Sequence, residues 1–152
     1  MLVQINPKLI IFIFLSFLFS SIINAEEIFL SLKKNKVNVR YGPSLESPVK
    51  YIYKKINLPI KQIDKKENWR RIIDLKNNSG WIHSSQLMST NSIIPLEDKV
   101  LFNKPSIFSK PIAKIKRGRV LIVTKCTEGW CKIKSGKNKG WIKIDNIWGS
   151  IN

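Results

Sequence analysis

Three tyrosines and three arginines in the first half of the chain could form a surface that binds a ligand. Aromatic rings stack on sugars and peptides, and a guanidinium group pairs with a carboxylate through two parallel hydrogen bonds. We therefore predict an aromatic and basic groove, which consists of Arg40, Tyr41, Tyr51, Tyr53, Arg70 and Arg71. The alternative is that Tyr51 and Tyr53 face a contact between the two halves of the chain.

The residue types give little support for catalysis. His83 is the only histidine and follows a Gly-Trp-Ile segment, where a surface or loop position is the simpler interpretation. Five carboxylates fall mainly near turns, with nothing to place two of them together: Asp64, Glu67, Asp74, Glu128 and Asp145. The sequence contains no nucleophile elbow, phosphate-binding loop, dinucleotide fingerprint or zinc motif. We predict a protein that is not an enzyme and has no cofactor or metal site.

The two cysteines, Cys126 and Cys131, are predicted to form a disulfide. The segment between them, Thr-Glu-Gly-Trp, suits a hairpin connection that would place the two cysteines opposite each other. Facing residues on neighbouring strands lie about 4.5–5.5 Å apart, which is within disulfide range. Closing so short a loop would stabilise the fold by roughly 2 kcal/mol, and a lone pair of cysteines is usually bonded in an exported chain.

Three sequence landmarks recur in the same order, which indicates two copies of one unit of about 60 residues. "GPSLESP" at 42–48 parallels "KPSIFSKP" at 104–111, "ENWRRI" at 67–72 parallels "EGWCKI" at 128–133, and "SGWIHSSQL" at 79–87 parallels "KGWIKIDNI" at 139–147. We place the first repeat at 28–89 and the second at 94–149. The segment 89–98, polar and proline-bearing, is expected to join them.

Each repeat is expected to consist of short strands separated by turn residues. The predicted strands of the first repeat are 28–32, 36–40, 49–53, 58–64, 69–74 and 79–83; those of the second are 99–102, 112–116, 119–125, 130–134 and 139–143. The segments 84–87 and 144–147 are each expected to form a single helical turn. Most of the five tryptophans are expected in the cores: Trp69, Trp81, Trp130, Trp141 and Trp148. The predicted fold class is all-β, with two small barrels in tandem.

The segment "VNVRYGPS", followed by "NWRRI" and "GWIH", resembles the bacterial SH3-like domain of secreted envelope proteins. The second repeat resembles a more divergent copy, in which Phe102 and Asn103 replace the asparagine-arginine of the first motif, so that a role of Arg40 would have no direct counterpart there. The resemblance covers nearly all of the chain after the N-terminal segment. It implies two SH3-like barrels, and it implies binding of peptidoglycan or peptides, because related modules are commonly attached to cell-wall enzymes.

The N-terminal segment has the features of a secretory signal peptide. Residues 9–19 are apolar apart from Ser16, and Lys8 precedes them. We expect residues 1–25 to be removed by cleavage between Ala25 and Glu26, which would make the protein secreted or periplasmic. A retained anchor is the alternative, although the apolar run is shorter than the ~20 residues that span a bilayer. No cysteine follows the run, so a lipoprotein is not expected, and the mature chain would have no transmembrane segment.

The chain carries 27 lysines and arginines against 10 acidic residues, a net charge of +17 that is spread over both halves. A basic surface favours partners of opposite charge, such as envelope polymers, but the excess of lysine could equally reflect base composition. We predict a secreted module that binds a cell-envelope polymer or peptide of the peptidoglycan type. The alternative is an adaptor that docks an envelope protein; nucleic acid is not expected as a partner of an exported protein.

Overall fold

The computed structural model describes residues 27–150. The predicted signal peptide and its cleavage site between Ala25 and Glu26 therefore lie outside the described residues. Within 27–150 the structure has no helix that is long and apolar enough to cross a membrane.

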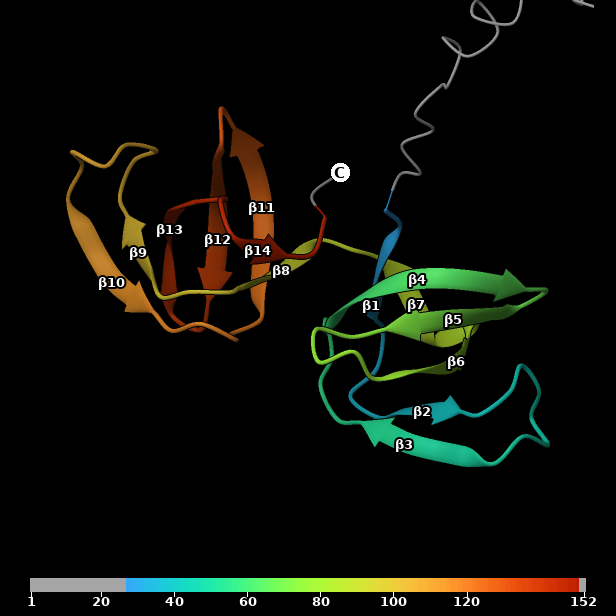
Figure 1. Ribbon diagram of the computed structural model, residues 1–152. Coiled ribbons are helices and arrows are strands. Elements are labelled where there is room, and N and C mark those ends of the chain that lie inside the picture. Colours follow the sequence, from blue (N-terminus) through green and yellow to red (C-terminus); the bar gives the residue numbers. More distant parts are fainter. Residues whose placement is uncertain (1–26, 151–152) are drawn as a thin grey trace, which may run out of the picture.

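Two seven-stranded antiparallel sheets account for most of the described chain (Figure 1). The first barrel contains β1 (Phe29–Leu32), β2 (Val37–Arg40), β3 (Val49–Tyr53), β4 (Pro59–Lys66), β5 (Trp69–Ile73), β6 (Ser79–His83), the 3-10 turn η1 (Ser84–Gln86) and β7 (Leu87–Ser89). The second barrel contains β8 (Ser92–Pro95), β9 (Lys99–Phe102), β10 (Pro111–Ile115), β11 (Leu121–Thr127), β12 (Trp130–Ser135), β13 (Asn138–Lys143) and β14 (Ile147–Trp148).

The two sheets have the same strand order. It is β3-β2-β6-β5-β4-β1-β7 in the first barrel and β10-β9-β13-β12-β11-β8-β14 in the second, so each strand has its counterpart seven strands later. The register agrees as well: Val39 pairs with Tyr51 in the first barrel, and Leu101 pairs with Ala113 at the equivalent place in the second. The predicted fold class, all-β with two tandem SH3-like barrels, is confirmed.

Alternating side chains give each barrel its own core. In β2, Val37 and Val39 are fully buried, whereas Asn38 and Arg40 point to the other face and are only half-buried. The first core consists of Leu32, Val37, Val39, Ile60, Ile72, Ile82 and Leu87. The second consists of Ile93, Leu101, Ile115, Leu121, Cys131, Ile133 and Ile142.

A glycine marks the same close approach in both barrels. A Cβ atom added to Gly140 would lie 2.6 Å from the carbonyl oxygen of Phe102, on the neighbouring strand β9. A Cβ atom added to Gly80 would overlap Cγ1 of Val39, on the neighbouring strand β2. The repeated Gly-Trp landmark therefore exists because only glycine lets these two strands meet over the core.

Two predictions about local structure were wrong. The segment 89–98 contains β8, which is buried along its whole length and pairs with β11 and β14. Residues 144–147 form no helical turn: Asn146 has a left-handed φ of 51°, which a right-handed helix does not allow, and β14 begins at Ile147. The helical turn predicted at 84–87 is present as η1.

Buried hydroxyl groups tie the two barrels together where β7 leads into β8. Ser31 donates a hydrogen bond to Thr90, with 2.9 Å between the hydroxyl oxygens, and Ser92 donates to the carbonyl oxygen of Asn57 at 2.7 Å. The indole nitrogen of Trp148 donates to the carbonyl oxygen of Pro59 at 3.0 Å. The ring of Trp148 also meets Phe29 edge to face, with 5.2 Å between the centroids. These contacts set how the second barrel lies against the first.

Candidate functional site

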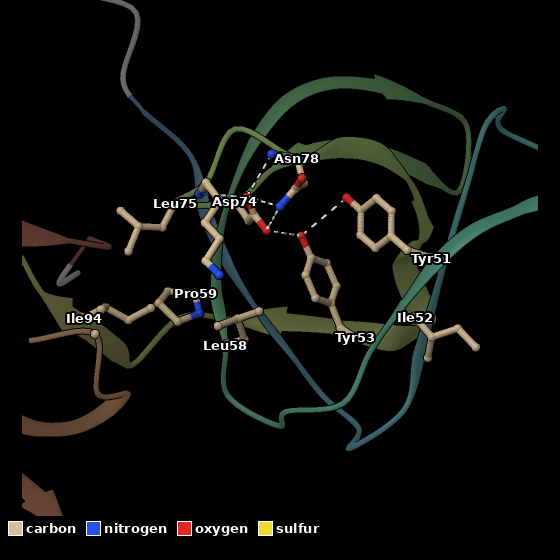
Figure 2. Close-up of a pocket in the computed structure, with 11 residues that line it drawn as sticks. Tyr51, Ile52, Tyr53, Leu58, Pro59, Asp74, Leu75, Asn78 and Ile94 are labelled. Atoms are coloured by element: carbon tan, nitrogen blue, oxygen red, sulfur yellow. Dashed lines mark hydrogen bonds between the residues drawn. The ribbon is translucent and has the colours of Figure 1, made fainter.

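A pocket of about 600 Å³ opens beside the junction, and residues of the first barrel form most of its wall (Figure 2). We call it the tyrosine pocket. It is lined by Tyr51, Ile52, Tyr53, Leu58, Pro59, Asp74, Leu75, Lys76 and Asn78 of the first barrel, and by Ile94 and Gly118 of the second. Its walls are mainly apolar, with phenol, carboxylate and amide groups gathered at one side, as is typical of small-molecule and peptide sites.

Strand β3 brings the two tyrosines into the pocket. Tyr51 and Tyr53 are two residues apart, so their side chains leave the same face of the strand and pack against the first core. Their rings meet edge to face, with 5.2 Å between the centroids and 3.4 Å between the hydroxyl oxygens. The pocket thus has a rigid aromatic wall whose position is set by the pairing of β3 with β2.

Asp74 holds the second tyrosine in place from the end of β5. The Tyr53 hydroxyl donates to Oδ2 of Asp74 at 3.0 Å, as Figure 2 shows. The same carboxylate accepts hydrogen bonds from the backbone N–H groups of Lys76 and Asn78 and from the side-chain amide of Asn78. Asp74 is only 9% exposed. Its hydrogen bonds are therefore satisfied within the protein, and its main effect is to orient Tyr53.

Burial raises the pKa of both phenols. For Tyr53 the rise is large, and the hydrogen bond with Tyr51 and the nearby charge of Asp74 add to the effect of burial. For Tyr51, burial raises the pKa and outweighs the opposing hydrogen bond with Tyr53. Both hydroxyls therefore stay protonated at neutral pH, so they offer a ligand neutral hydrogen-bonding groups and not a general base.

The structure does not gather the six predicted groove residues in one place. Tyr51 and Tyr53 line the tyrosine pocket, which Ile94 and Gly118 of the second barrel also line. Arg40 donates to the carbonyl oxygen of Ser47 at 2.7 Å and thereby fastens the β2–β3 loop. Tyr41, 65% exposed, lies in that loop with the ammonium group of Lys50 5.5 Å from its ring centroid.

The remaining two arginines lie on β5. Arg70 donates to the carbonyl oxygens of Glu67 and Trp69 and so closes the turn that precedes it. Arg71 pairs in register with Trp81, and Trp81 pairs with Arg40 on its other side. Arg40, Trp81 and Arg71 thus form a cross-strand row over β2, β6 and β5, which is separate from the tyrosine pocket.

The second barrel has a corresponding cross-strand row that the sequence did not reveal. Phe102, Trp141, Lys132 and Lys125 follow one another across β9, β13, β12 and β11. The ammonium groups of Lys125 and Lys132 lie 5.4 Å and 5.9 Å from the Trp141 ring centroid. These lysines cover the indole, which leaves Trp141 only 7% exposed. Here lysine and tryptophan stabilise each other on the surface of the barrel.

Sequence reasoning also missed Asp74 and Leu58 as pocket residues. Asp74 carried a detectable signal, because an aspartate at a strand end before Leu-Lys-Asn-Asn is typical of a turn in which the side chain binds backbone N–H groups. Its contact with Tyr53 could not be derived, since it depends on how β3 and β5 curve toward each other.

The cysteines and the histidine make contacts that stabilise the fold. Cys126 and Cys131 face each other in the β11–β12 hairpin and form the predicted disulfide, with 4.1 Å between their Cα atoms. His83 stacks edge to face on Trp69, at 5.2 Å between centroids, and its Nδ1 atom lies 2.8 Å from the Ser85 hydroxyl. Among residues 27–150, no three histidine, cysteine or acidic side chains are arranged to hold a metal ion.

Comparison with known protein families agrees with the architecture. The bacterial SH3 domain family matches the chain twice, over residues 33–88 and 97–149. No curated protein matches. Among solved structures, the chain is similar to NlpC2 of Trichomonas vaginalis, with 13% identity, a TM-score of 0.38 and coverage of 82% of this chain and 49% of that one. It is similar to NlpC1 of the same organism, with 12% identity, a TM-score of 0.38 and coverage of 86% and 49%. The chain therefore spans about half the length of these proteins.

Proposed function

The chain belongs to the bacterial SH3 domain family, and we propose that it is an exported, non-catalytic module that binds a peptide of a cell-envelope polymer in the tyrosine pocket. The two family segments, 33–88 and 97–149, cover most of the described chain. Modules of this family commonly bind peptidoglycan. The proposal therefore assigns the binding to one barrel and to one pocket of that barrel.

The observation that carries this proposal is the pairing of an apolar wall with fixed polar groups in one pocket. Tyr51 and Tyr53 are held rigidly, so a ligand that stacks on them loses little of its binding energy to ordering the protein. Leu58 and Ile52 offer apolar surface for aliphatic side chains. Such a surface suits a short peptide with small apolar side chains.

Two groups are positioned to fix the orientation of that peptide. Among residues 27–150, the Tyr51 hydroxyl has Tyr53 as its one hydrogen-bond partner, at 3.4 Å, so it can exchange a further hydrogen bond with a peptide amide. Lys76 lines the same pocket and carries a charge that can pair with a terminal carboxylate. A cell-wall peptide with a free carboxylate meets both requirements.

Export is part of the proposal, because the envelope polymer lies outside the cytoplasm. The N-terminal segment with its expected cleavage after Ala25 supports it. The disulfide between Cys126 and Cys131 supports it as well, since such bonds persist in oxidising compartments.

Co-sedimentation with isolated peptidoglycan tests the proposal on the chain that begins at Glu26. Replacing Tyr51 with Ala removes half of the aromatic wall and is expected to weaken binding about tenfold, the typical effect of losing one buried aromatic contact. Tyr41→Ala is the matched control, because Tyr41 is an exposed tyrosine of the same barrel that does not line the pocket. Equal losses in the two variants, or none in either, would refute the assignment.

A protein-docking role is the second candidate, and one loop favours it. Ile107 and Phe108, in the β9–β10 loop, are 62% and 94% exposed. An apolar pair displayed in this way can anchor a protein partner. A photo-crosslinking residue at position 108 would decide between the two functions: an adduct with one defined protein, together with undiminished peptidoglycan binding by Phe108→Ser, would show that the loop serves a partner.

A further inference from the structure

A second hollow at the junction collects positive charge from both barrels. It has a volume of about 660 Å³ and is lined by Asn35, Lys54, Lys55, Ile56 and Asn57 of the first barrel and by Arg119, Val120, Ile122, Lys134, Ser135 and Gly136 of the second. We propose that this cationic pocket binds a phosphate-bearing anion and is a site distinct from the tyrosine pocket. The two pockets share no lining residue.

Turns of both barrels shape the cationic pocket. Asn57 follows β3 with a left-handed φ of 61°, and its N–H group donates to the carbonyl oxygen of Leu32 at 2.9 Å. On the other side of the junction, Gly136 forms the β12–β13 turn with a φ of 59°. The hydrogen bond from Ser92 to Asn57 holds the two sides together. The pocket therefore exists only because the barrels are joined as they are.

No acidic group neutralises the four cations of this pocket, and they differ from the other lysines and arginines without an ion pair in residues 27–150 because they line one hollow. Lys54, Lys55, Arg119 and Lys134 form no ion pair with the carboxylates of residues 27–150, and the lining of the pocket contains no aspartate or glutamate. Elsewhere lysines do meet carboxylates: Lys99 lies 2.6 Å from Asp145, and Lys116 lies 3.0 Å from Asp98. Four unneutralised charges around one hollow attract an anion and repel one another without it.

The number of cations favours phosphate over carboxylate. A phosphate group can carry a charge of about −1.5 to −2 on three acceptor oxygens, whereas a carboxylate carries one charge on two oxygens. A phosphate can therefore meet more of the four cations at once, and the three lysines among them bind phosphate as compact point charges. Asn35 and Ser135 also line the pocket and add neutral hydrogen-bonding groups. The ligand class is therefore a phosphate polymer or another closely spaced phosphate group.

Binding of a polyphosphate of defined length, measured by calorimetry on the chain that begins at Glu26, tests this proposal. The double variant Lys54→Gln/Lys55→Gln is expected to weaken binding about tenfold. The matched control is Lys65→Gln/Lys66→Gln: it removes the same charge from two adjacent exposed lysines that do not line the cationic pocket. The control should change the affinity less than twofold.

A variant in the second barrel tests the proposal independently. Arg119→Gln should weaken polyphosphate binding severalfold, because the proposal requires both barrels to contribute. Equal losses in the Lys54/Lys55 and Lys65/Lys66 variants would overturn the proposal and show only general attraction to a basic surface. An unchanged affinity in Arg119→Gln would overturn it too.

Two further probes are used. One distinguishes a phosphate polymer from a lipid headgroup, and the other distinguishes phosphate from carboxylate. Tighter binding of polyphosphate than of phosphatidylglycerol vesicles supports a phosphate polymer, and the reverse supports a lipid headgroup as the source of the same chemistry. A carboxylate polymer, polyglutamate, that binds as tightly as polyphosphate and responds equally to Lys54→Gln/Lys55→Gln would overturn the phosphate assignment. Peptidoglycan binding should persist in the Lys54/Lys55 variant, so failure here is distinguishable from failure of the tyrosine pocket.

Discussion

The first and second barrels share one strand order but differ at the positions that form the tyrosine pocket. Register places Ala113 where the first barrel has Tyr51, and Ile115 where it has Tyr53. Ser135, buried like Asp74, ends the strand equivalent to β5. The second barrel therefore closes without the two phenols and the carboxylate. Because the fold does not require them, their presence in the first barrel favours a role in binding.

At another position, the second barrel has a charged residue where the first barrel has an apolar one. Lys99 occupies the place of the core residue Val37, and it is only 7% exposed. Its ammonium group lies 2.5 Å from Glu97 and 2.6 Å from Asp145. Burial opposes the charged form, but these two hydrogen bonds outweigh burial and raise the pKa of Lys99. The same position thus carries an apolar contact in one barrel and an ion-pair cluster in the other.

The largest effect is expected when the first barrel is given the residues of the second. The triple variant Tyr51→Ala/Tyr53→Ile/Asp74→Ser should keep its strands, since Ala113, Ile115 and Ser135 are compatible with the same sheet. Its binding to isolated peptidoglycan should fall at least a hundredfold, because the aromatic wall is removed entirely. Co-sedimentation measures the binding, and circular dichroism checks the fold. Retained binding would mean that the two barrels do not differ in function.

The stability of each barrel should depend to a similar degree on the glycine of its Gly-Trp segment. Gly80→Ala and Gly140→Ala are each expected to destabilise their own barrel by about 1–3 kcal/mol, since the added methyl group meets a neighbouring strand. Hydrogen exchange measured by NMR resolves the two barrels separately. Gly118→Ala serves as a comparison, because a Cβ atom there meets nothing within 4 Å and only its left-handed φ of 78° opposes the change.

The disulfide should matter to one barrel only. Reduction of Cys126–Cys131 is expected to destabilise the second barrel by roughly 2 kcal/mol, since it frees a short loop in the unfolded chain. The equivalent hairpin of the first barrel pairs Lys65 with Arg70 and has no such bond. Thermal unfolding with and without reductant, followed by NMR, should therefore show loss of the second barrel at a lower temperature while the first is unchanged. Equal shifts in both barrels would contradict this.

Acid should also destabilise the two barrels to different extents, although this effect is smaller. Hydrogen bonds from the Arg117 N–H group and Lys116 lower the pKa of Asp98 from its ordinary 3.8 to about 2. Hydrogen bonds from Lys99 lower the pKa values of Glu97 and Asp145. A lowered pKa in the folded state stabilises the fold above the ordinary value, and this contribution is lost as the pH falls toward 2. The second barrel should therefore open before the first between about pH 4 and pH 2, as amide exchange would show. The reverse order would contradict the assigned ion pairs.

The sequence predicted those parts of the fold that depend on local patterns. The alternation around Val37 and Val39 and the repeated Gly-Trp landmarks located most strands of both barrels. Strands β7, β8 and β14 were not predicted, because they are short and are stabilised by partners distant in the chain. The pairing of Trp148 with Ile94 is an example. Pattern alone could not show that Ser92 is buried, because the groups that satisfy it, Ser31 and Asn57, lie in the other barrel.

The candidate site was predictable only as far as residue type. The sequence drew attention to Tyr51 and Tyr53, and alternation along a strand puts them on one face. It could not separate them from Arg40 and Arg71, because that separation arises from strand register: both arginines flank Trp81. The placement of Asp74 beside Tyr53 joins residues from different strands and depends on the curvature of the sheet.

Mapping of a soluble peptidoglycan fragment by NMR tests the central claim, that the first barrel binds through its tyrosine pocket and the second does not. During titration of the chain that begins at Glu26, the backbone signals of Tyr51, Tyr53 and Asp74 should shift, whereas those of Ala113, Ile115 and Ser135 should stay in place. Shifts that centre on the second barrel, or that fall equally on both barrels, would contradict the claim.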